Sequence, residues 1–186
     1  MERLNAQPML LIDVSRIPPE GLDVKAPLDS GEVHVAGEEG FRLEPGGSLE
    51  CHVEKGDDET VHVQGHLSAR LGLECGRCLE PFSFPVEQNL DLFYLPHQAG
   101  ESVEDEEEIA ERDLVVAYYR QGRLDLGDMV REQFFLTLPM KRLCRAECLG
   151  LCATCGSNRN LNPCECPAVG APLSPFSGLF EKGPSS

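Results

Sequence analysis

Hydrophobic residues alternate with polar ones along two long neighbouring segments in the middle of the chain. From Thr60 to Cys75, valine, alanine and leucine fall mostly on one face, and from Glu80 to Tyr94 the apolar residues fall at even positions, with Gln88 as the polar break. A period of two is typical of a strand with one buried face. The two segments therefore predict a long β-hairpin, whose tip carries the sequence Cys-Gly-Arg-Cys.

Shorter segments with the same period flank this hairpin. Residues 9–17 predict an edge strand and a turn, which Pro18 and Pro19 end. Residues 22–28, 32–36 and 48–54 predict a meander separated by Gly, Pro and Asp clusters. Residues 114–119 are β-branched and aromatic and predict a further strand of the sheet.

One segment has helical spacing. Apolar residues recur from Leu126 to Leu138, and Pro139 follows them. Asp125 can cap the helix, and Asp128 suits its first turn, where the helix dipole favours an acid. We expect a helix over residues 125–138 that lies on the sheet. The fold class predicted is α+β: a mainly antiparallel β meander with a long hairpin, one packed helix and a C-terminal Cys-rich zinc knuckle.

Six of the nine cysteines lie between Cys144 and Cys166, with the spacing C-x3-C-x3-C-x2-C-x8-C-x-C. This stretch holds few large aliphatic residues, so burial alone cannot fold it. Glycine and asparagine fill it instead, and these residues suit turns and positive φ. Because zinc takes four thiolates and a C-x2-C pair can bind one ion, the pattern is typical of a zinc knuckle. Disulfides and ordinary buried thiols are the alternatives.

The redox compartment favours zinc over disulfides. The N-terminal residues show neither the basic and apolar regions nor the cleavage site of a signal peptide, and no apolar run approaches the roughly 20 residues of a membrane span. We therefore expect a soluble cytoplasmic protein with reduced thiols. An odd count of nine cysteines also argues against a closed disulfide framework.

Eight clustered cysteines divide into two four-thiolate zinc sites, with Cys51 left over. The short Gly- and Asn-rich turn favours a quartet of Cys152, Cys155, Cys164 and Cys166. The second quartet is then Cys75, Cys78, Cys144 and Cys148, which would join the hairpin tip to the end of the helix. A single site of Cys148, Cys152, Cys155 and Cys164 is the competing interpretation. A thioredoxin-like pair at the hairpin tip is disfavoured, because a strand and not a helix follows it.

Charge is distributed unevenly. The formal net charge is −16, and residues 101–113 carry eight acids against one base. This acidic insert is either a solvated connector or a docking strip for a cationic partner, with five consecutive candidate residues: Glu104, Asp105, Glu106, Glu107 and Glu108. The cysteine-rich end has the opposite tendency and offers candidates for local RNA contact: Arg77, Lys141, Arg142, Arg145 and Arg159.

These observations predict three parts. Residues 1–140 form a β-rich domain that includes the acidic insert, residues 141–167 form a zinc-binding module, and residues 168–186 form a mobile tail rich in Pro, Gly and Ser.

Several motifs together resemble one known family. They are the C-x2-C between two strands, the acidic insert, the run from Leu124 through Leu-Pro-Met-Lys, the block Cys-Leu-Gly-Leu-Cys-Ala-Thr-Cys-Gly-Ser-Asn-Arg-Asn-Leu, and the final Pro175-Phe176-x-x-Leu179. This set is similar to the bacterial YceD family, over about residues 60–182. The resemblance implies a non-enzymatic role in maturing or stabilising large-subunit ribosomal RNA.

The resulting hypothesis is an acidic adaptor for a basic ribosomal protein or assembly factor, with direct or indirect contact to large-subunit RNA. We expect no enzyme and no small-molecule substrate, because no histidine lies near the cysteine cluster in sequence and a four-thiolate zinc has no open position for water. A zinc-thiolate chaperone that senses oxidation is the alternative.

Overall fold

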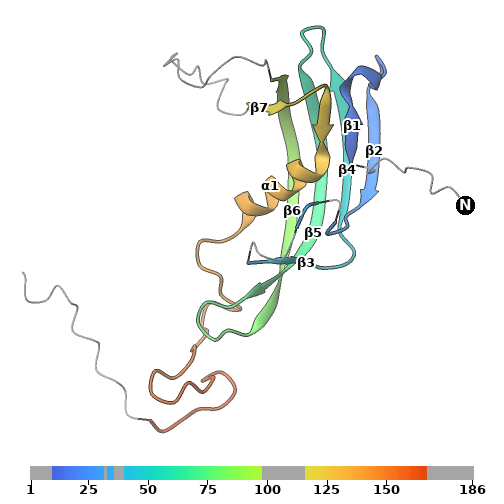
Figure 1. Ribbon diagram of the computed structural model, residues 1–186. Helices are drawn as coiled ribbons and strands as arrows, with labels where there is room; N and C mark the ends of the chain where they lie inside the picture. Colours follow the sequence, from blue (N-terminus) through green and yellow to red (C-terminus); the bar gives the residue numbers. More distant parts are fainter. Residues whose placement is uncertain (1–9, 32, 36–39, 98–115, 167–186) are drawn as a thin grey trace, which may run out of the picture.

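The computed structural model describes residues 10–31, 33–35, 40–97 and 116–166, and its centre is a twisted sheet (Figure 1). Five strands of this sheet are hydrogen-bonded in the order β2-β4-β5-β6-β7, and β3 pairs with β5 off this path. Their bounds are β2 Leu22–Pro27, β3 Arg42–Leu43, β4 Ser48–Lys55, β5 Val61–Glu74, β6 Pro81–Pro96 and β7 Val116–Tyr119.

Among the described residues, a second, two-stranded sheet and one α-helix accompany this sheet. Strand β1 (Leu11–Asp13) pairs antiparallel with β8 (Arg123–Asp125), and a short 3-10 helix, η1 (Val14–Arg16), follows β1. Helix α1 (Leu126–Thr137) follows β8 directly. The expected α+β class is confirmed, since the part of the chain that the structure describes has mostly antiparallel strands and one α-helix.

The predicted hairpin is confirmed and dominates the sheet. Strands β5 and β6 pair along their length, from Val61 opposite Tyr94 to Glu74 opposite Pro81. Buried residues occupy every odd position of β5 except the glycine at position 65, as the alternation requires. A hairpin of this length reaches from the core to the cysteine-rich end of the molecule (Figure 1).

Helix α1 covers the inner face of the sheet. Met129, Val130 and Phe134 are buried in the same core as Val86 and other inward residues of the hairpin. The polar break in β6 has a partner on this helix, because Gln88 Nε2 donates a hydrogen bond of 2.8 Å to Thr137 Oγ1. A polar residue is tolerated on this inner face because its hydrogen bond is satisfied.

The caps of α1 are those expected from the sequence. The Asp125 side chain accepts hydrogen bonds from the backbone N–H groups of Gly127 and Asp128, so it satisfies donors that the first turn leaves unpaired. The helix ends at Thr137, ahead of Leu138 and Pro139, since proline cannot continue it.

One strand prediction is wrong. Where residues 32–36 are described they are not a strand: Val33 and His34 lie in a turn, and Val35 has no regular secondary structure. The Val33 N–H donates to the Asp29 carbonyl, and the Val35 N–H to the Ser30 carbonyl, at 3.0 Å each. Both valines are buried, so their alternation reports burial and not extended backbone.

The meander prediction is also incomplete. Strand β7 was expected and is present, but it pairs parallel to β6, with Phe93 opposite Val116. The short strands β3 and β8 were not predicted, because two or three residues are too few to show a period.

Three predictions lie outside the described residues or beyond what the fold tests. The acidic insert 101–113 and the tail 168–186 lie outside the described residues. The division at residue 140 stays a prediction. Among the described helices, none has the length and apolar character that crossing a membrane demands.

Candidate metal centres

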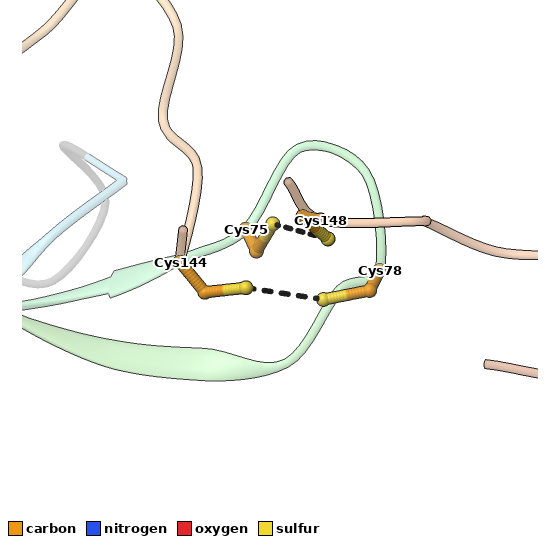
Figure 2. Close-up of side chains that lie close together, drawn as sticks. All are labelled: Cys75, Cys78, Cys144 and Cys148. Carbon is orange, nitrogen blue, oxygen red and sulfur yellow. Dashed lines mark hydrogen bonds between the residues drawn. The ribbon is translucent and has the colours of Figure 1, made fainter. Parts of the chain in front are cut away.

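Four cysteines from two distant parts of the chain meet at the tip of the hairpin (Figure 2). Cys75 and Cys78 come from the β5–β6 turn, and Cys144 and Cys148 come from the segment after α1. Their sulfur atoms all lie within 4.8 Å of one another. We call these four residues the hairpin cluster. Cys75, Cys78 and Cys148 are buried, and Cys144 is partly exposed.

The sulfur separations fit a tetrahedral metal site. Cys75 Sγ lies 3.8 Å from Cys148 Sγ, and Cys78 Sγ lies 3.8 Å from Cys144 Sγ. Zinc binds thiolates at ~2.3 Å, so a regular tetrahedron around it has sulfur–sulfur edges of about 3.8 Å. A disulfide needs its sulfurs at ~2.05 Å. The arrangement could therefore hold one metal ion, and all nine cysteines are free in the structure.

The backbone of the hairpin tip turns both thiols the same way. The Cys75 N–H donates to the Glu80 carbonyl at 3.0 Å, and the Leu79 N–H donates back to the Cys75 carbonyl at 2.9 Å. Leu79 adopts a φ of 61°, in the left-handed region that leucine rarely occupies. The turn thus forms a knuckle in which the residue after the second cysteine has positive φ.

A second cluster lies within the cysteine-rich segment itself. Its members are Cys152, Cys155, Cys164 and Cys166, and their sulfur atoms also lie within 4.8 Å of one another. We call these residues the loop cluster. Cys155 is exposed and the other three are half-buried, so the loop cluster is more accessible than the hairpin cluster.

The loop cluster contains a C-x2-C turn of the same type as the one in the hairpin cluster. The Cys152 N–H donates to the Ser157 carbonyl at 2.8 Å, and the Gly156 N–H donates to the Cys152 carbonyl at 2.9 Å. Gly156 has a φ of 72° and takes the place that Leu79 has at the hairpin tip. Two C-x2-C segments far apart in sequence therefore have matching hydrogen bonds and matching positive φ.

The two quartets expected from the sequence are the two groups that the structure brings together. The competing single site is not gathered among the described residues, because Cys148 lies in the hairpin cluster with Cys75. Cys51, the cysteine left over, is buried in the main core, and burial raises the pKa of its thiol to about 11. That the clusters bind a metal, and which metal it is, stays a prediction.

One asparagine between the two cysteine pairs of the loop cluster contacts the hairpin cluster, and a different role was expected for it. Asn160 Nδ2 donates to Cys148 Sγ at 3.4 Å, while Asn160 Oδ1 accepts from the Leu149 N–H at 2.9 Å and from Arg145 Nη2 at 2.7 Å. Asparagine was expected here for turns and positive φ. Asn160 does lie in a turn, but among the described residues of this segment only Gly150 and Gly156 have positive φ. The signal for this role was the Asn-Arg-Asn sequence between two cysteine pairs.

Within the hairpin cluster, the pKa values of some thiols are lowered and those of others are raised. Burial raises the pKa of Cys75, but backbone hydrogen bonds with Cys144, Arg77 and Cys78 outweigh it and lower the pKa to about 6. Burial and the neighbouring thiols raise the pKa of Cys144 to about 12. Four thiols this close cannot all ionise unless a cation offsets their repulsion.

The loop cluster shows the same separation. Backbone hydrogen bonds from Cys155 and Thr154 lower the pKa of Cys152 to about 6, and the thiolate of Cys155 raises the pKa of Cys166 to about 12. In both clusters the first cysteine of the knuckle has a pKa lowered to about 6. Hydrogen bonds also lower the pKa of one further thiol in each cluster, Cys148 and Cys155. This donor set fits a soft or borderline divalent metal such as zinc.

The arginines proposed to contact RNA have structural partners. Arg77 Nη1 donates to the Cys148 carbonyl at 3.0 Å, Arg142 Nη1 donates to the Gly40 carbonyl at 2.7 Å, and Arg145 contacts Asn160 as described above. Lys141 and Arg159 are exposed. Three of the five candidates therefore hold the cysteine-rich segment in place, and their contact with RNA stays a prediction.

Comparison with known proteins gives one family and several relatives. Residues 63–180 match the model of the family described as large ribosomal RNA subunit accumulation protein YceD. An uncharacterized protein of Mycobacterium leprae is 31% identical over 106 residues, which are 56% of this chain and 46% of that protein. An uncharacterized protein of Mycobacterium tuberculosis is 34% identical over 99 residues, which are 53% of this chain and 44% of that protein.

A plant relative carries an informative name. The maize protein named large ribosomal RNA subunit accumulation protein YCED homolog 1, chloroplastic, is 26% identical over 144 residues, which are 65% of this chain and 49% of that protein. The chain spans about half the length of the curated relatives it matches. No solved structure matches it. Because the family model covers more than half of the chain, and includes both knuckles, this protein belongs to the YceD family of large ribosomal RNA subunit accumulation proteins.

Proposed function

We propose that both cysteine clusters are structural zinc sites. The observation that supports this is the sulfur geometry of the hairpin cluster, whose 3.8 Å separations equal the edge of a zinc-thiolate tetrahedron. Zinc held there would act as a cross-link between the hairpin tip and the segment after α1. Structural zinc can supply roughly 10–16 kcal/mol of apparent binding free energy to a peptide that otherwise does not fold.

The remaining residues of each site orient the thiols. Asn160 donates to Cys148 Sγ, and the knuckle backbone directs N–H groups at Cys75 and Cys152. Partners of this kind fix ligand orientation and commonly change metal affinity by about 10- to 100-fold when removed. Metal analysis of purified protein tests the proposal: two zinc ions per chain support it, and one or none would overturn the assignment.

We further propose that the protein is a non-enzymatic factor for the accumulation of large-subunit ribosomal RNA. Membership of a family with that name supports this role, as does the name of the maize relative. Four thiolates around each metal would leave no open coordination position, so the sites would give shape and not catalysis. Depleting the protein in its own cells should lower large-subunit RNA relative to small-subunit RNA, and wild-type protein should restore it.

Within this role, we propose that the acidic insert makes the protein an adaptor for a basic ribosomal protein or assembly factor. The insert carries eight acids against one base in a chain of net charge −16, which favours cationic partners at long range. Neutralising Glu104–Glu108 should abolish capture of a basic partner at low salt. Capture that persists at the wild-type level would remove the adaptor from the proposal.

Contact with RNA is proposed to be local and confined to the cysteine-rich end. Lys141 and Arg159 are exposed candidates there, and Arg77 and Arg145 are exposed as well although they make the contacts given above. Each four-thiolate zinc group would carry a charge of −2 that offsets part of the positive excess. Crosslinking in cells, followed by identification of the bound RNA or ribosomal protein, separates direct from indirect contact.

The alternative function is a zinc-thiolate chaperone that senses oxidation, and the loop cluster favours it. Cys155 is exposed, and Cys152 has a pKa lowered to about 6, which makes it a reactive thiolate. Mild oxidant would then release zinc and create the ability to hold unfolded clients. Zinc release without gain of that ability would leave only the constitutive adaptor.

A further inference from the structure

The outer face of the main sheet, opposite α1, is open among the described residues. Helix α1 and the β1–β8 pair pack with the inner face (Figure 1), where the buried core lies. The outward positions of β2, β4, β5 and β6 carry six carboxylates, namely Asp23, Glu50, Glu54, Glu74, Glu87 and Asp91. Only Lys25 and Arg70 oppose them at these positions. We call this surface the outer face.

Three histidines are interleaved with these carboxylates. His52 Nδ1 lies 2.7 Å from Asp23 Oδ1, and His62 Nε2 lies 2.7 Å from Asp91 Oδ1. His66 Nε2 lies 2.9 Å from Glu87 Oε2. Strand register explains the pattern, because consecutive outward residues of four neighbouring strands form rows across the sheet. One such row is Asp23, His52, Gln64 and Asp91.

The carboxylates keep most of their surface available to a partner. The side chains of Asp23, Glu87 and Asp91 are 82%, 60% and 69% exposed although each is bonded to a histidine. A carboxylate has two oxygens and can accept several hydrogen bonds, so a cation can still bind on the solvent side. With the histidines neutral the outer face is net negative, and with all three protonated most of that charge is cancelled.

We propose that the outer face is a docking surface for a cationic, Lys- or Arg-rich protein segment, and that acidification weakens the docking. The inference deepens the proposed adaptor function, since the partner class is the same, but it rests on a different surface from the acidic insert. Charge complementarity carries it, because exposed carboxylates lie at regular strand spacing on a face that no described element covers.

The sign of the pH effect follows from the neighbours of each histidine. His52 faces Asp23 on β2 and Glu54 on its own strand, His62 faces Asp91 on β6, and His66 faces Glu87 on β6 and Glu50 on β4. Every neighbour that ionises is an acid. Protonated histidines therefore offset the negative charge of the carboxylates that a cationic segment would bind. The affinity of the outer face for that segment should fall as pH drops.

The test uses full-length protein in which Glu104–Glu108 are neutralised, so that five of the eight acids of the insert no longer compete for the probe. The probe is a synthetic octalysine peptide at low salt. Amide NMR shifts should cluster in β4, β5 and β6. A variant with Glu87→Gln and Asp91→Asn should bind about three- to tenfold more weakly, the range that two exposed ion contacts allow.

The matched control removes the same charge elsewhere. Glu20→Gln with Asp57→Asn alters two exposed acids in loops off the outer face and should leave the affinity unchanged. Equal weakening by both variants, or shifts confined to other residues, overturns the docking surface. Well-dispersed spectra check that each variant is folded.

Two further measurements complete the test. Binding at pH 5.5 should be weaker than at pH 8, and replacing the three histidines with glutamine should remove most of that difference. A dimer in sedimentation that Glu87→Gln with Asp91→Asn disrupts would show that a second copy covers the face, which contradicts the proposal. If only the insert variant loses a basic partner, the adaptor function survives and the outer face is ruled out.

Discussion

The two cysteine clusters each contain the same type of C-x2-C turn, but they join residues at very different separations in the sequence. The hairpin cluster connects sulfurs 66 and 73 positions apart, whereas all four members of the loop cluster lie within residues 152–166. By the relation for covalent cross-links, closing such loops is worth about 4 kcal/mol and about 3 kcal/mol respectively. Loop closure alone therefore separates the clusters by only ~1 kcal/mol.

The larger difference lies in what each cluster holds. The hairpin cluster has three buried cysteines and packs with Phe82 and Leu143, which connects it to the sheet through Phe82. The loop cluster holds only its own loop and reaches the rest of the molecule through contacts such as Asn160 to Cys148. With zinc bound as proposed, the hairpin cluster would stabilise the joined structure, and the loop cluster would shape a local surface.

Removing the knuckle cysteines gives the largest expected difference. Cys75→Ser with Cys78→Ser should lower the free energy of unfolding by at least about 4 kcal/mol, because the cross-link between distant segments is lost. Cys152→Ser with Cys155→Ser should leave unfolding of the sheet within about 0.5 kcal/mol of wild type. Denaturant unfolding followed by circular dichroism measures both, since the chain has no tryptophan. Equal losses of unfolding free energy in the two variants would contradict the different roles of the two clusters.

Metal removal should follow the same order. A chelator added to zinc-loaded protein should take the first ion from the loop cluster, because Cys155 is exposed, and the second only when the buried hairpin cluster opens. Two kinetic phases of zinc release are expected in a colorimetric assay. The Cys152→Ser, Cys155→Ser variant should lack the fast phase; a single phase in wild type would contradict the prediction.

Asn160 tests the connection between the clusters. Asn160→Ala should weaken zinc binding at the hairpin cluster by about 10-fold or more and cost roughly 1–3 kcal/mol, because Cys148 loses its donor and Arg145 its acceptor. Asn162→Ala removes an exposed asparagine two positions away and is the control. Competition with a chelator of known affinity measures both. Similar behaviour of the two variants would show that Asn160 does not support the metal site.

Substitutions of the residue after the second cysteine of each knuckle, Leu79 or Gly156, should change stability in opposite directions. Leu79 has a φ of 61° and is 55% exposed, so Leu79→Gly relieves backbone strain and loses little packing, for a net gain of up to about 1 kcal/mol. Gly156→Ala adds strain at a φ of 72° where space is open, and should cost the loop cluster about 1 kcal/mol. Zinc affinity reports the second change. A gain from Gly156→Ala would refute the shared geometry.

The smallest effect concerns pH and lies away from both clusters. Hydrogen bonds with Asn89 and Glu87 raise the pKa of His66 above its usual value in the folded state. Its contribution to stability is therefore full below the pKa of the unfolded chain and is lost as pH rises through the higher folded pKa. His66→Gln should flatten this dependence in melting curves recorded from pH 5 to 8. An unchanged slope would exclude His66 as its source.

Sequence patterns predicted two kinds of feature correctly: an alternation of buried and exposed residues that persists over many positions, and a helix start with a strong capping residue. The hairpin shows its alternation over two long strands, and Asp125 is a strong helix cap, so both were predicted correctly. Residues 32–36 were mistaken for a strand because buried valines alternate in turns as well. The parallel direction of β7 depends on the route of the connection before it, which local sequence does not encode.

The site was predictable as groups of ligands but not as a network. Cysteine spacing suggested both quartets, and the structure brings the same sulfurs together. The shared knuckle was hidden because Leu79 stands where glycine is expected. The roles of Asn160 and of the arginines depend on contacts between residues far apart in sequence, such as Arg142 with Gly40.

The length of the hairpin sets a distance in the molecule. Strand β5 has 14 residues, and at ~3.4 Å per residue it spans about 45 Å. The cysteine knuckle lies at one end of this span. At the other end lie Pro96, where β6 ends, and Val116, where β7 begins, and the acidic insert lies between these two residues in the sequence. If one macromolecule binds at each end, the length of the hairpin would separate the two by roughly this distance.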